Sequence, residues 1–457
     1  MHGLFPFELT ENQNNAITNI AQFLSEEKFA FVLKGYAGTG KTTLIATLVK
    51  QRNLSNFRTI LLAPTGRAAK VMGNYAGKQA FTIHRFIYMP KQSGGKLSYR
   101  LRQNKSTRTL FVVDESSMIG DQRDGQKNSL LEDLLLFVSE GAYCSILFVG
   151  DNAQLPPVGQ QLSPALDIVN LQYLIDDKPK SIELTEVVRQ AQKSYIVQNA
   201  TIIRSGLEQQ SFDHLQFNVG PDFIRLTDGY EIQDRLTECY QQEQEETRLI
   251  VRSNKRANLY NQQIRSRILW LENELASGDE LMVVKNNYFW VDPKSEMSFI
   301  ANGETIEILS FKNRVELYGY HFVDAEVRFP DFPNEKPIDV KLMLDVLSLD
   351  GPNLDYTKQT EFFNEVMLDY QHLPKTQAIK ATLNNEYYNA LQVKFAYAIT
   401  CHKAQGGQWK NIFVEQSWIP DGKMDADYFR WLYTAITRAT GSVYLLGFKN
   451  EYFNDLD

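Results

Sequence analysis

The sequence predicts an α/β fold built on a parallel sheet, and three observations support this prediction. A short apolar strand, Phe29–Lys34, runs directly into a glycine-rich loop of the form GxxxxGKT, and Thr42–Gln51 then has the pattern of a helix. Three more short apolar runs follow, each ending in polar residues: 59–63, 110–113 and 144–149. Such strands, separated by helices, are typical of a parallel sheet covered on both faces. Functional residues are therefore expected at the carboxyl ends of these strands.

Length and composition limit the class of protein. The chain has 457 residues, enough for two to four domains, and its content of charged residues is typical of globular proteins. Cys144, Cys239 and Cys401 lie far apart without CxxC spacing, so neither a zinc site nor a disulfide framework is expected. A reducing compartment and a cytoplasmic location fit this cysteine usage. We read no signal peptide and no apolar run long enough to span a membrane, so no membrane partner is expected.

The distribution of charge is more informative than its sum. The net charge is −7, but the window from Lys28 to Val113 contains sixteen Lys and Arg and no carboxylate. The remainder of the chain therefore carries a net charge of −23. Because affinity for phosphate groups depends on local basic contacts, this window predicts a surface that binds a polyanion.

Other elements of the first part follow from local pattern. Residues 14–24 have apolar spacing typical of a helix. Between Phe86 and Arg108 the α/β pattern breaks, and a Gly-Gly pair stands between polar arms that contain tyrosine. This segment predicts a small β-hairpin, with an irregular surface loop as the alternative.

The second part repeats the α/β pattern from about Ser181. Its early elements are expected at 249–251, 254–268 and 281–284. From Gly303 to about Glu386 the residues alternate between apolar and polar, which predicts a small antiparallel β insertion. The α/β pattern then resumes at 395–400, 412–414 and 443–447.

The glycine-rich loop predicts a nucleotide site. Its backbone N–H groups and the helix that follows are expected to hold phosphates, with Lys41 reaching the β- and γ-phosphates. The hydroxyl of Thr42 is expected to ligate Mg²⁺. The residues predicted to contact the nucleotide in this segment are Gly35, Gly38, Thr39, Gly40, Lys41, Thr42 and Thr43.

Two acids follow the strand at 110–113. Asp114 fits a second Mg²⁺ contact, and Glu115 can polarise a water molecule for attack on the γ-phosphate. A GKT loop together with this acidic pair predicts ATP hydrolysis rather than passive nucleotide binding.

Three further side chains are candidates for catalysis. Gln154 follows the strand at 144–149 and can bond a γ-phosphate or its attacking water, although an exposed loop amide is the alternative. Arg189 and Arg438 can supply the planar, permanently charged group that stabilises a phosphoryl transition state.

The order of these motifs resembles that of the superfamily 1 helicases. The segments LTENQNNAI (9–17), GYAGTGKT, APTGRAAK (63–70), TIHRF, VVDESSM, GDNAQLPPVG, LTEVVRQ, AYAITCHKAQGGQW (396–409) and YTAITRAT occur in the family order. The chain is most similar to the RecD-like and Dda-like helicases of the RecD/Pif1 branch, from about Leu9 to Ala439. It lacks the long N-terminal region of larger RecD-type proteins.

The resemblance implies a domain organisation. Two RecA-like domains are expected, one from 1–86 and 108–178 and the other from 179–302 and 389–457. The hairpin would be the duplex-splitting pin, at 87–107. The second insertion, at 303–388, would be SH3-like.

The resemblance also assigns roles to residues. Gln13 would read adenine, and Gly406 would contribute to the nucleotide site. Single-stranded DNA would be contacted by residues of both RecA-like domains, namely Pro64, Thr65, Arg67, His84, Arg85, Thr400, His402 and Lys403. The branch translocates 5′→3′ along single-stranded DNA.

The sequence therefore predicts an ATP- and Mg²⁺-dependent DNA helicase. It would act as a monomer on single-stranded DNA and on single-strand/duplex junctions, in replication, repair or recombination. Two alternatives share the motifs. One is a DNA-stimulated translocase that remodels protein–DNA complexes without separating strands. The other is a RecD-like subunit of a larger nuclease complex.

Overall fold

The computed structural model describes residues 8–50, 57–93, 96–123, 128–175, 177–188, 191–213, 215–292, 295, 297, 299–417, 419 and 423–454, without the side chains of 90–99. The chain divides into two units. Unit 1 comprises Met1–Ile87, Leu101–Thr227 and Ala404–Asp457. Unit 2 comprises Tyr88–Arg100 and Asp228–Lys403.

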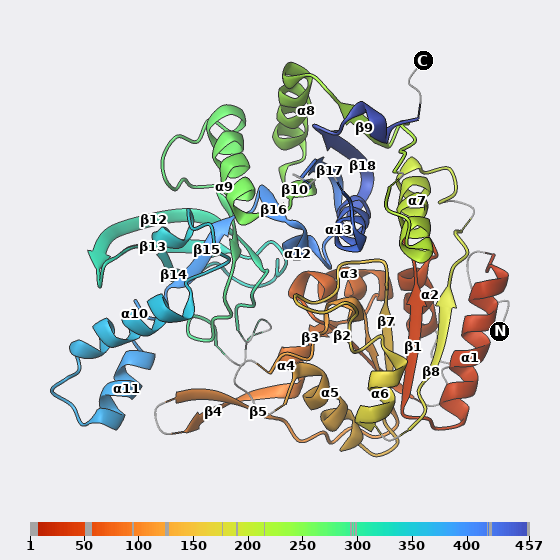
Figure 1. Ribbon diagram of the computed structural model, residues 1–457. Helices are drawn as coiled ribbons and strands as arrows, with labels where there is room; N and C mark the ends of the chain where they lie inside the picture. Colours follow the sequence, from red (N-terminus) through yellow and green to blue (C-terminus); the bar gives the residue numbers. More distant parts are fainter. Residues whose placement is uncertain are drawn as a thin grey trace. The chain divides into compact units, whose positions relative to one another are not determined.

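Unit 1 is built on a six-stranded sheet in which all neighbouring strands are parallel (Figure 1). The strand order is β3-β2-β6-β7-β1-β8. The strands are β1 (Ala30–Gly35), β2 (Arg58–Ala63), β3 (Ala80–Thr82), β6 (Thr109–Val113), β7 (Ser145–Gly150) and β8 (Lys180–Leu184). Every residue of β6 and β7 is buried, as expected for strands covered on both faces. The predicted α/β fold is thus confirmed.

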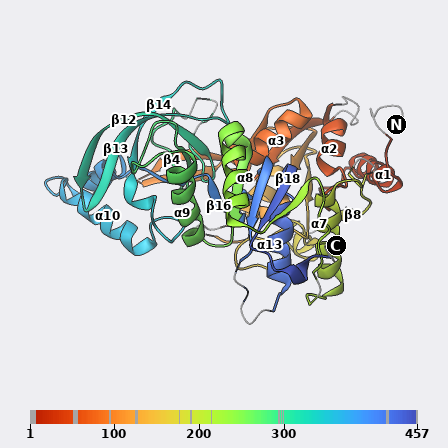
Figure 2. The same ribbon diagram turned by 90° about the horizontal axis from the view of Figure 1, so that it is seen from above.

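Helices pack around the strands of unit 1, and their apolar residues supply the core. They are α1 (Glu11–Ser25), α2 (Lys41–Lys50), α3 (Gly66–Ala76), α4 (Ile83–Ile87), α5 (Leu130–Ser139), α6 (Ile168–Ile175), α7 (Tyr195–Gln209) and α13 (Ala426–Ile436), with a 3₁₀ turn, η2, at Ser116–Met118. Phe23 of α1 and Leu44 of α2 pack against Phe31 of β1 and Leu147 of β7 in one cluster. Figure 1 shows α1 beside β8, and Figure 2 shows α7 against α13.

The strand β8 corrects one expectation. The sequence assigned the segment from about Ser181 to the second α/β pattern, but β8 pairs in parallel with β1 at the edge of the first sheet. Apolar periodicity identifies a strand but not its partner, because pairing depends on contacts far along the chain.

A second parallel arrangement in unit 1 contains three strands. In it β18 (Ala439–Leu446) lies between β9 (Phe223–Leu226) and β17 (Trp409–Glu415), and both pairings are parallel. A short 3₁₀ turn, η7 (Asn450–Tyr452), follows near the end of the described chain.

The largest part of unit 2 is a closed five-stranded barrel. Its strands are β11 (Glu280–Val283), β12 (Thr305–Leu317), β13 (Tyr320–Arg328), β14 (Ile338–Met343) and β15 (Leu391–Phe395). Side chains such as Ile306, Val327 and Leu342 fill its interior without exposure. Two helices follow β14 and the 3₁₀ turn η5 (Leu344–Val346), namely α10 (Tyr356–Leu368) and α11 (Lys375–Leu383).

The barrel extends beyond the insertion that alternation predicts. We assigned 281–284 and 395–400 to the α/β pattern, and this was wrong for 281–283 and for Phe395, because they belong to β11 and β15, which close the barrel. Ala398–Thr400 does form a parallel strand pair, as the α/β pattern predicts. Both strands are almost wholly buried. The apolar run of β11 is typical of a buried sheet strand, whereas β15 alternates between apolar and polar residues. The two helices within the insertion were not predicted.

The remaining elements of unit 2 include a pair of parallel strands and the predicted hairpin. β10 (Thr247–Val251) pairs in parallel with β16 (Ala398–Thr400). α8 (Gly229–Gln242), the 3₁₀ turn η3 (Gln244–Glu246) and α9 (Asn254–Gln263) surround β10 in the chain, and a π-helical turn, η4, spans Ile264–Ile268. β4 (Tyr88–Ser93) and β5 (Lys96–Leu101) form a two-stranded sheet, which confirms the hairpin. Finally, α12 (Cys401–Ala404) carries the chain from unit 2 back to unit 1.

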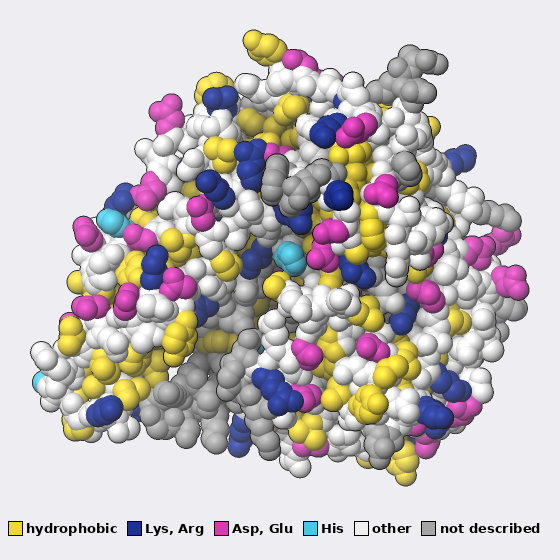
Figure 3. Space-filling model, in the orientation of Figure 1, with side chains coloured by type: hydrophobic (Ala, Val, Ile, Leu, Met, Phe, Trp, Pro, Cys, Tyr) yellow, Lys and Arg dark blue, Asp and Glu magenta, His cyan; other side chains and the backbone are white. Residues whose placement is uncertain are grey.

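The surface carries charges of both signs, and the described helices do not include a membrane span. Side chains of both charge signs are interspersed over the face that Figure 3 shows, in keeping with 48 basic and 55 acidic residues in the chain. Within the described part of the chain, no helix combines the length and apolar character needed to span a membrane.

Candidate functional site

The glycine-rich loop connects the end of β1 to the start of α2, as the sequence predicts. Gly38 and Gly40 both have positive φ, 77° and 76°, a conformation that favours glycine. A Cβ on Gly38 would lie 2.8 Å from Cγ1 of Val197, and one on Gly40 would lie 2.9 Å from Nε2 of Gln13. The loop is therefore packed closely by its surroundings, in a conformation that glycine adopts readily at these two positions.

Lys41 folds back over this loop. Its ammonium donates to the carbonyl oxygens of Gly35 and, at 3.0 Å, Tyr36. The same nitrogen lies 3.6 Å from Oδ2 of Asp151, at the end of β7. Thr42 and Thr43 follow in the first turn of α2, and the side chain of Thr43 is exposed. The cation of Lys41 is thus held by protein oxygens.

Asp114 and Glu115 follow β6, which lies two strands away from β1. Oδ1 of Asp114 accepts the backbone N–H of Glu115 at 2.9 Å, and Glu115 has a positive φ of 50°, which is unusual for a residue with a side chain. Desolvation by burial, followed by the charge of Glu115, raises the pKa of Asp114 to about 7, although part of its surface remains accessible. A cation bound nearby would favour the ionised carboxylate and offset this shift, which keeps Asp114 a candidate for holding Mg²⁺.

The segment after β7 contributes two buried side chains. Asp151 is 1% exposed, and burial raises the pKa of its carboxyl. Gln154 is 7% exposed, and within the described residues its Oε1 atom has no hydrogen-bond partner. A buried amide oxygen without a partner is costly, which marks Gln154 as a group that awaits a ligand or water. The alternative of an exposed loop amide does not fit this burial.

Arg438 reaches the same place from the end of α13. It is 4% exposed and donates to the carbonyl oxygens of Thr434 at 3.1 Å and Gly407 at 3.4 Å. Its guanidinium lies 3.5 Å from Oε1 of Glu115. The other arginine predicted for catalysis, Arg189, lies outside the described residues.

The two remaining nucleotide candidates differ in their positions. Gln13 donates from Nε2 to the carbonyl of Thr39 at 2.9 Å, so it contacts the phosphate loop directly. Gly406 instead packs against the start of α3, where a Cβ would lie 2.9 Å from Cβ of Ala68 and 3.0 Å from Oγ1 of Thr65. Gly406 therefore packs against a segment predicted to bind DNA.

The DNA-binding candidates of unit 1 gather at two helix starts. Pro64 and Thr65 lie between β2 and α3, and Oγ1 of Thr65 caps α3 by accepting the N–H of Ala68 at 3.2 Å. The guanidinium of Arg67 stacks 4.0 Å from the ring centroid of Trp409. Arg67 thus has a structural contact beside any role in DNA binding.

His84 and Arg85 lie on the short helix α4, after β3. Both side chains are partly exposed, and burial lowers the pKa of His84. Arg85 lies 5.6 Å from the ring centroid of Phe81. A neutral imidazole and a charged guanidinium are thus adjacent on this helix.

Thr400, His402 and Lys403 lie in unit 2, at the end of β16 and on α12. His402 is exposed, and partial desolvation lowers its pKa. Lys403 bonds to Oδ1 of Asn302, and burial lowers its pKa to about 8. These residues form a separate group within unit 2.

Two members of the phosphate-loop cluster were missed from the sequence. Asp151 stands three residues before the predicted Gln154, and Tyr433 stands five residues before Arg438. The hydroxyl of Tyr433 donates to Oδ2 of Asp151 at 2.8 Å and accepts the N–H of Ala37 at 2.7 Å. Their place in the same motifs was the available signal, but buried aromatic residues on helices are usually core.

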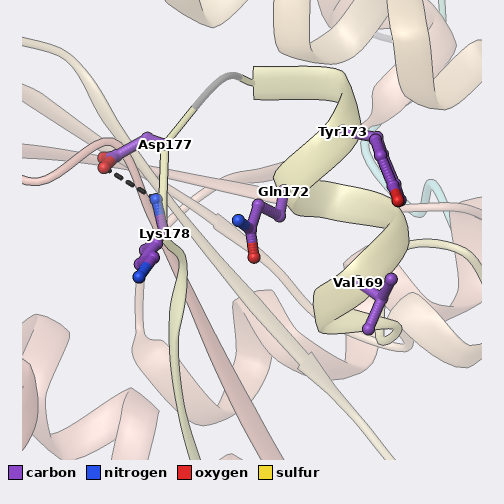
Figure 4. A pocket seen from close by; sticks show the side chains of 5 residues that line it. All are labelled: Val169, Gln172, Tyr173, Asp177 and Lys178. Carbon is purple, nitrogen blue, oxygen red and sulfur yellow. Dashed lines mark hydrogen bonds between the residues drawn. The ribbon is translucent and has the colours of Figure 1, made fainter.

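A surface cavity of about 560 Å³ lies elsewhere in unit 1, at α6 (Figure 4). It is lined by Val169, Gln172, Tyr173, Asp177 and Lys178. Figure 4 shows the first three side chains on α6, with the last two on the segment that follows. None of the site residues described above lines it, so the cavity is separate from the phosphate loop.

Family models match two parts of the chain. A model described as an AAA domain matches residues 8–225, and one described as a UvrD-like helicase C-terminal domain matches 395–446. The first includes the phosphate loop and Asp114, and the second includes Gly406 and Arg438.

Curated relatives include two named DNA helicases. The ATP-dependent RecD2 DNA helicase of Deinococcus radiodurans is 36% identical over 37% of this chain and 21% of its own length. The ATP-dependent DNA helicase dda of Enterobacteria phage T4 is 24% identical over 96% of this chain and 99% of its own length. The uncharacterized protein MJ1519 of Methanocaldococcus jannaschii is 25% identical over 91% of this chain. The chain spans about a third of MJ1519 and a fifth of RecD2, but nearly all of dda.

Among solved structures, the Pif1 helicase from Candida albicans aligns with 98% of this chain and 96% of its own, with 15% sequence identity and a TM-score of 0.48.

Proposed function

We propose that this chain is an ATP-dependent DNA helicase of the RecD/Pif1-like branch of superfamily 1. The matches to an AAA domain and a UvrD-like helicase C-terminal domain, and the similarity to RecD2 and dda, support this proposal. In this proposal it translocates 5′→3′ along single-stranded DNA and separates the duplex ahead of it. The polarity rests on the resemblance to the family.

The observation that carries the proposal is the convergence of strand ends in unit 1. The loop after β1 brings Lys41, the turn after β6 brings Glu115, and the turn after β7 brings Gln154. Arg438 joins them from α13, 3.5 Å from Glu115. A cation, a carboxylate, an unpartnered amide and a guanidinium are the groups that hydrolysis of a phosphoanhydride requires.

The chemistry follows from the roles these groups can take. The loop N–H groups and the Lys41 ammonium bind the β- and γ-phosphates of ATP, while Gln13 contacts the same loop at Thr39. Glu115 accepts the proton of the attacking water, and the Gln154 amide orients that water. Arg438 stabilises the charge that develops on the transferred phosphoryl group.

The residues also fit a magnesium ion. Asp114 and Thr42 would hold it, and when bound it neutralises phosphate charge. Among the described residues no group of three or more His, Cys, Asp or Glu could hold a metal ion. That finding is compatible with Mg²⁺, which commonly uses one or two carboxylates with substrate phosphates and water.

DNA binding is assigned to the strand-end segments of both units. Thr65 and Arg85 in unit 1 and His402 and Lys403 in unit 2 would contact the sugar–phosphate backbone. Contacts to the DNA backbone provide affinity without distinguishing bases, so a single strand of any sequence would be bound. Affinity should fall steeply with salt in spite of the acidic net charge.

Strand displacement tests this proposal. Duplexes with a 5′ or a 3′ single-stranded tail are incubated with ATP and Mg²⁺, using Lys41→Ala as the control. We expect unwinding from the 5′ tail only, and none by the variant. Equal unwinding from a 3′ tail would overturn the polarity, and full activity of Lys41→Ala would overturn the ATP mechanism.

The alternative of a translocase that does not separate strands is tested by the hairpin. Replacing residues 90–105 with a short Gly-Ser linker removes most of β4 and β5. We expect unwinding to be lost while DNA-stimulated ATP hydrolysis is retained. Unwinding that survives this deletion would contradict the assignment of the hairpin as the pin.

A further inference from the structure

The hydroxyl of Tyr433 occupies an unexpected position in unit 1. Tyr433 lies on α13 and is only 1% exposed, so its ring belongs to the hydrophobic core. Its hydroxyl nevertheless accepts the N–H of Ala37 in the phosphate loop at 2.7 Å and donates to Oδ2 of Asp151 at 2.8 Å. One hydroxyl therefore joins the phosphate loop, the segment after β7 and α13.

The bond to Ala37 uses a group that a phosphate would need. Ala37 lies inside the GxxxxGKT loop, whose backbone N–H groups are the donors for bound phosphate. The other strong donor, Lys41, is held by the carbonyls of Gly35 and Tyr36 and lies near Asp151. These two donors are thus bonded to groups of the protein itself.

The same helix is attached to the segment after β7 at the next residue. Oγ1 of Thr434 accepts the N–H of Leu155 at 2.8 Å, and the carbonyl of Leu155 accepts from Nε2 of Gln405 at 2.7 Å. Arg438 follows just after the end of α13 and lies beside Glu115. The position of Tyr433 is therefore linked to the position of the catalytic guanidinium.

We propose that the Tyr433 hydroxyl is a positioning group that latches α13 onto the phosphate loop, and that a bound nucleotide phosphate displaces it from Ala37. This inference rests on the proposed function, because it requires that the loop binds nucleotide. It adds a mechanism by which occupancy of the loop reaches Arg438.

The latch has a definite energetic consequence. The hydroxyl competes with a phosphate oxygen for the same N–H. A nucleotide must break this bond when it binds, and the free energy needed to do so lowers the nucleotide affinity of the wild type. Replacing Tyr433 by Phe keeps the ring and removes the hydroxyl, which leaves Ala37 and Asp151 without this partner in the empty state. The empty state is then raised in free energy more than the bound state, and nucleotide binds more tightly.

A purely structural hydroxyl predicts a different result. If its bonds persist in the bound state, the variant loses stability equally with and without nucleotide, and affinity does not change. Tighter binding by a destabilised variant is therefore the diagnostic outcome.

The experiment compares Tyr433→Phe with Tyr428→Phe. Tyr428 is also buried on α13, but its hydroxyl accepts from Nε2 of Gln416 at 3.1 Å rather than from the phosphate loop. The dissociation constants of ADP and of a non-hydrolysable ATP analogue are measured by calorimetry, with thermal unfolding in the presence and absence of ligand. We expect Tyr433→Phe to bind roughly fivefold more tightly than the wild type and Tyr428→Phe to bind as the wild type does.

Thermal unfolding supplies the second readout. The Tm of Tyr433→Phe should fall without nucleotide and should recover towards the wild-type value at saturating nucleotide. Unchanged or weaker binding by this variant, with an equal loss of Tm in both conditions, would overturn the latch. A wild-type protein that binds neither ligand would instead overturn the proposed function, so the two failures are distinguishable.

Discussion

The phosphate-loop region of unit 1 and the region around β11 of unit 2 both bury charged side chains, but they pair them differently. In unit 2, Arg265 meets Asp279 through two hydrogen bonds of 2.8 Å each. These side chains are 7% and 0% exposed. Arg248 is bonded to Glu280 in the same region, and both are almost fully buried.

In unit 1 the pairs are looser. Lys41 lies 3.6 Å from Asp151, and Arg438 lies 3.5 Å from Glu115. Asp114 retains a raised pKa of about 7, which shows that its charge is poorly compensated. Tightly paired buried charges fit a structural role, whereas buried charges without close partners are typical of a site that waits for a charged ligand.

Glu115→Gln should show the largest effect on function in the phosphate-loop region. Because Glu115 is the proposed base, we expect DNA-stimulated ATP hydrolysis to fall roughly a thousandfold. Nucleotide binding and Tm should be preserved, since the lost pair with Arg438 is loose. Hydrolysis is measured by phosphate release with excess single-stranded DNA. A loss of tenfold or less would mean that another group acts as the base.

Arg265→Ala should give the opposite pattern. Removing one partner of a tight buried pair leaves Asp279 uncompensated, and we expect the free energy of unfolding to fall by about 3–5 kcal/mol. Urea denaturation measures this loss, and ATP hydrolysis per folded molecule should persist.

The matched control for that variant is Arg314→Ala. Arg314 pairs with Glu274 at 2.7 Å, but the two side chains are 57% and 48% exposed. Its removal should change stability by no more than about 0.5 kcal/mol. Equal losses from both variants would remove the distinction between tight buried pairs and surface pairs.

Asp114 predicts a pH dependence of the metal- and nucleotide-free protein. Its folded pKa of about 7 exceeds the ordinary value of 3.8, so the folded protein keeps a proton that the unfolded chain releases. Stability from this group is therefore highest below about pH 4, falls as pH rises to about 7 and then levels off. Asp114→Asn has no carboxyl at this position, so its stability should not fall in this way as the pH rises.

Urea denaturation of both proteins at pH 5 and pH 8 checks the sign. The stability of Asp114→Asn relative to the wild type should increase with pH, by on the order of a few kcal/mol. Parallel pH profiles would show that Asp114 is already compensated, like Asp279 in unit 2.

The smallest expected effect concerns DNA binding. Arg85→Glu, in the acid-free window, should weaken binding to single-stranded DNA by about tenfold at low salt, and the difference should shrink as salt rises. Arg314→Glu, in the 303–388 segment, should leave affinity within about twofold. Fluorescence anisotropy measures both variants. Equal weakening would mean that the window is a feature of composition alone.

Particular residues show how far sequence reasoning extends. Lys41, Asp114 and Glu115 were predicted as a site because each stands where an apolar strand ends, and parallel strands end at one edge of a sheet. Gly406 was predicted for the nucleotide, but in the structure it packs against Thr65 and Ala68. The resemblance located its motif without specifying which neighbour it contacts.

What the sequence determined by itself is the set of local elements. The strands of the central sheet, the phosphate loop, the hairpin and the acidic pair follow from periodicity and from spacing over fewer than about twenty residues, where neighbours in the chain are neighbours in space. The inclusion of β8 in the first sheet and of β11 and β15 in the barrel came only from the tertiary structure. The meeting of Ala37 with Tyr433, 396 residues later, also needed it. Such contacts join segments whose sequence patterns are those of ordinary buried helices and strands. Only the packing of the folded chain therefore determines which buried groups contact one another.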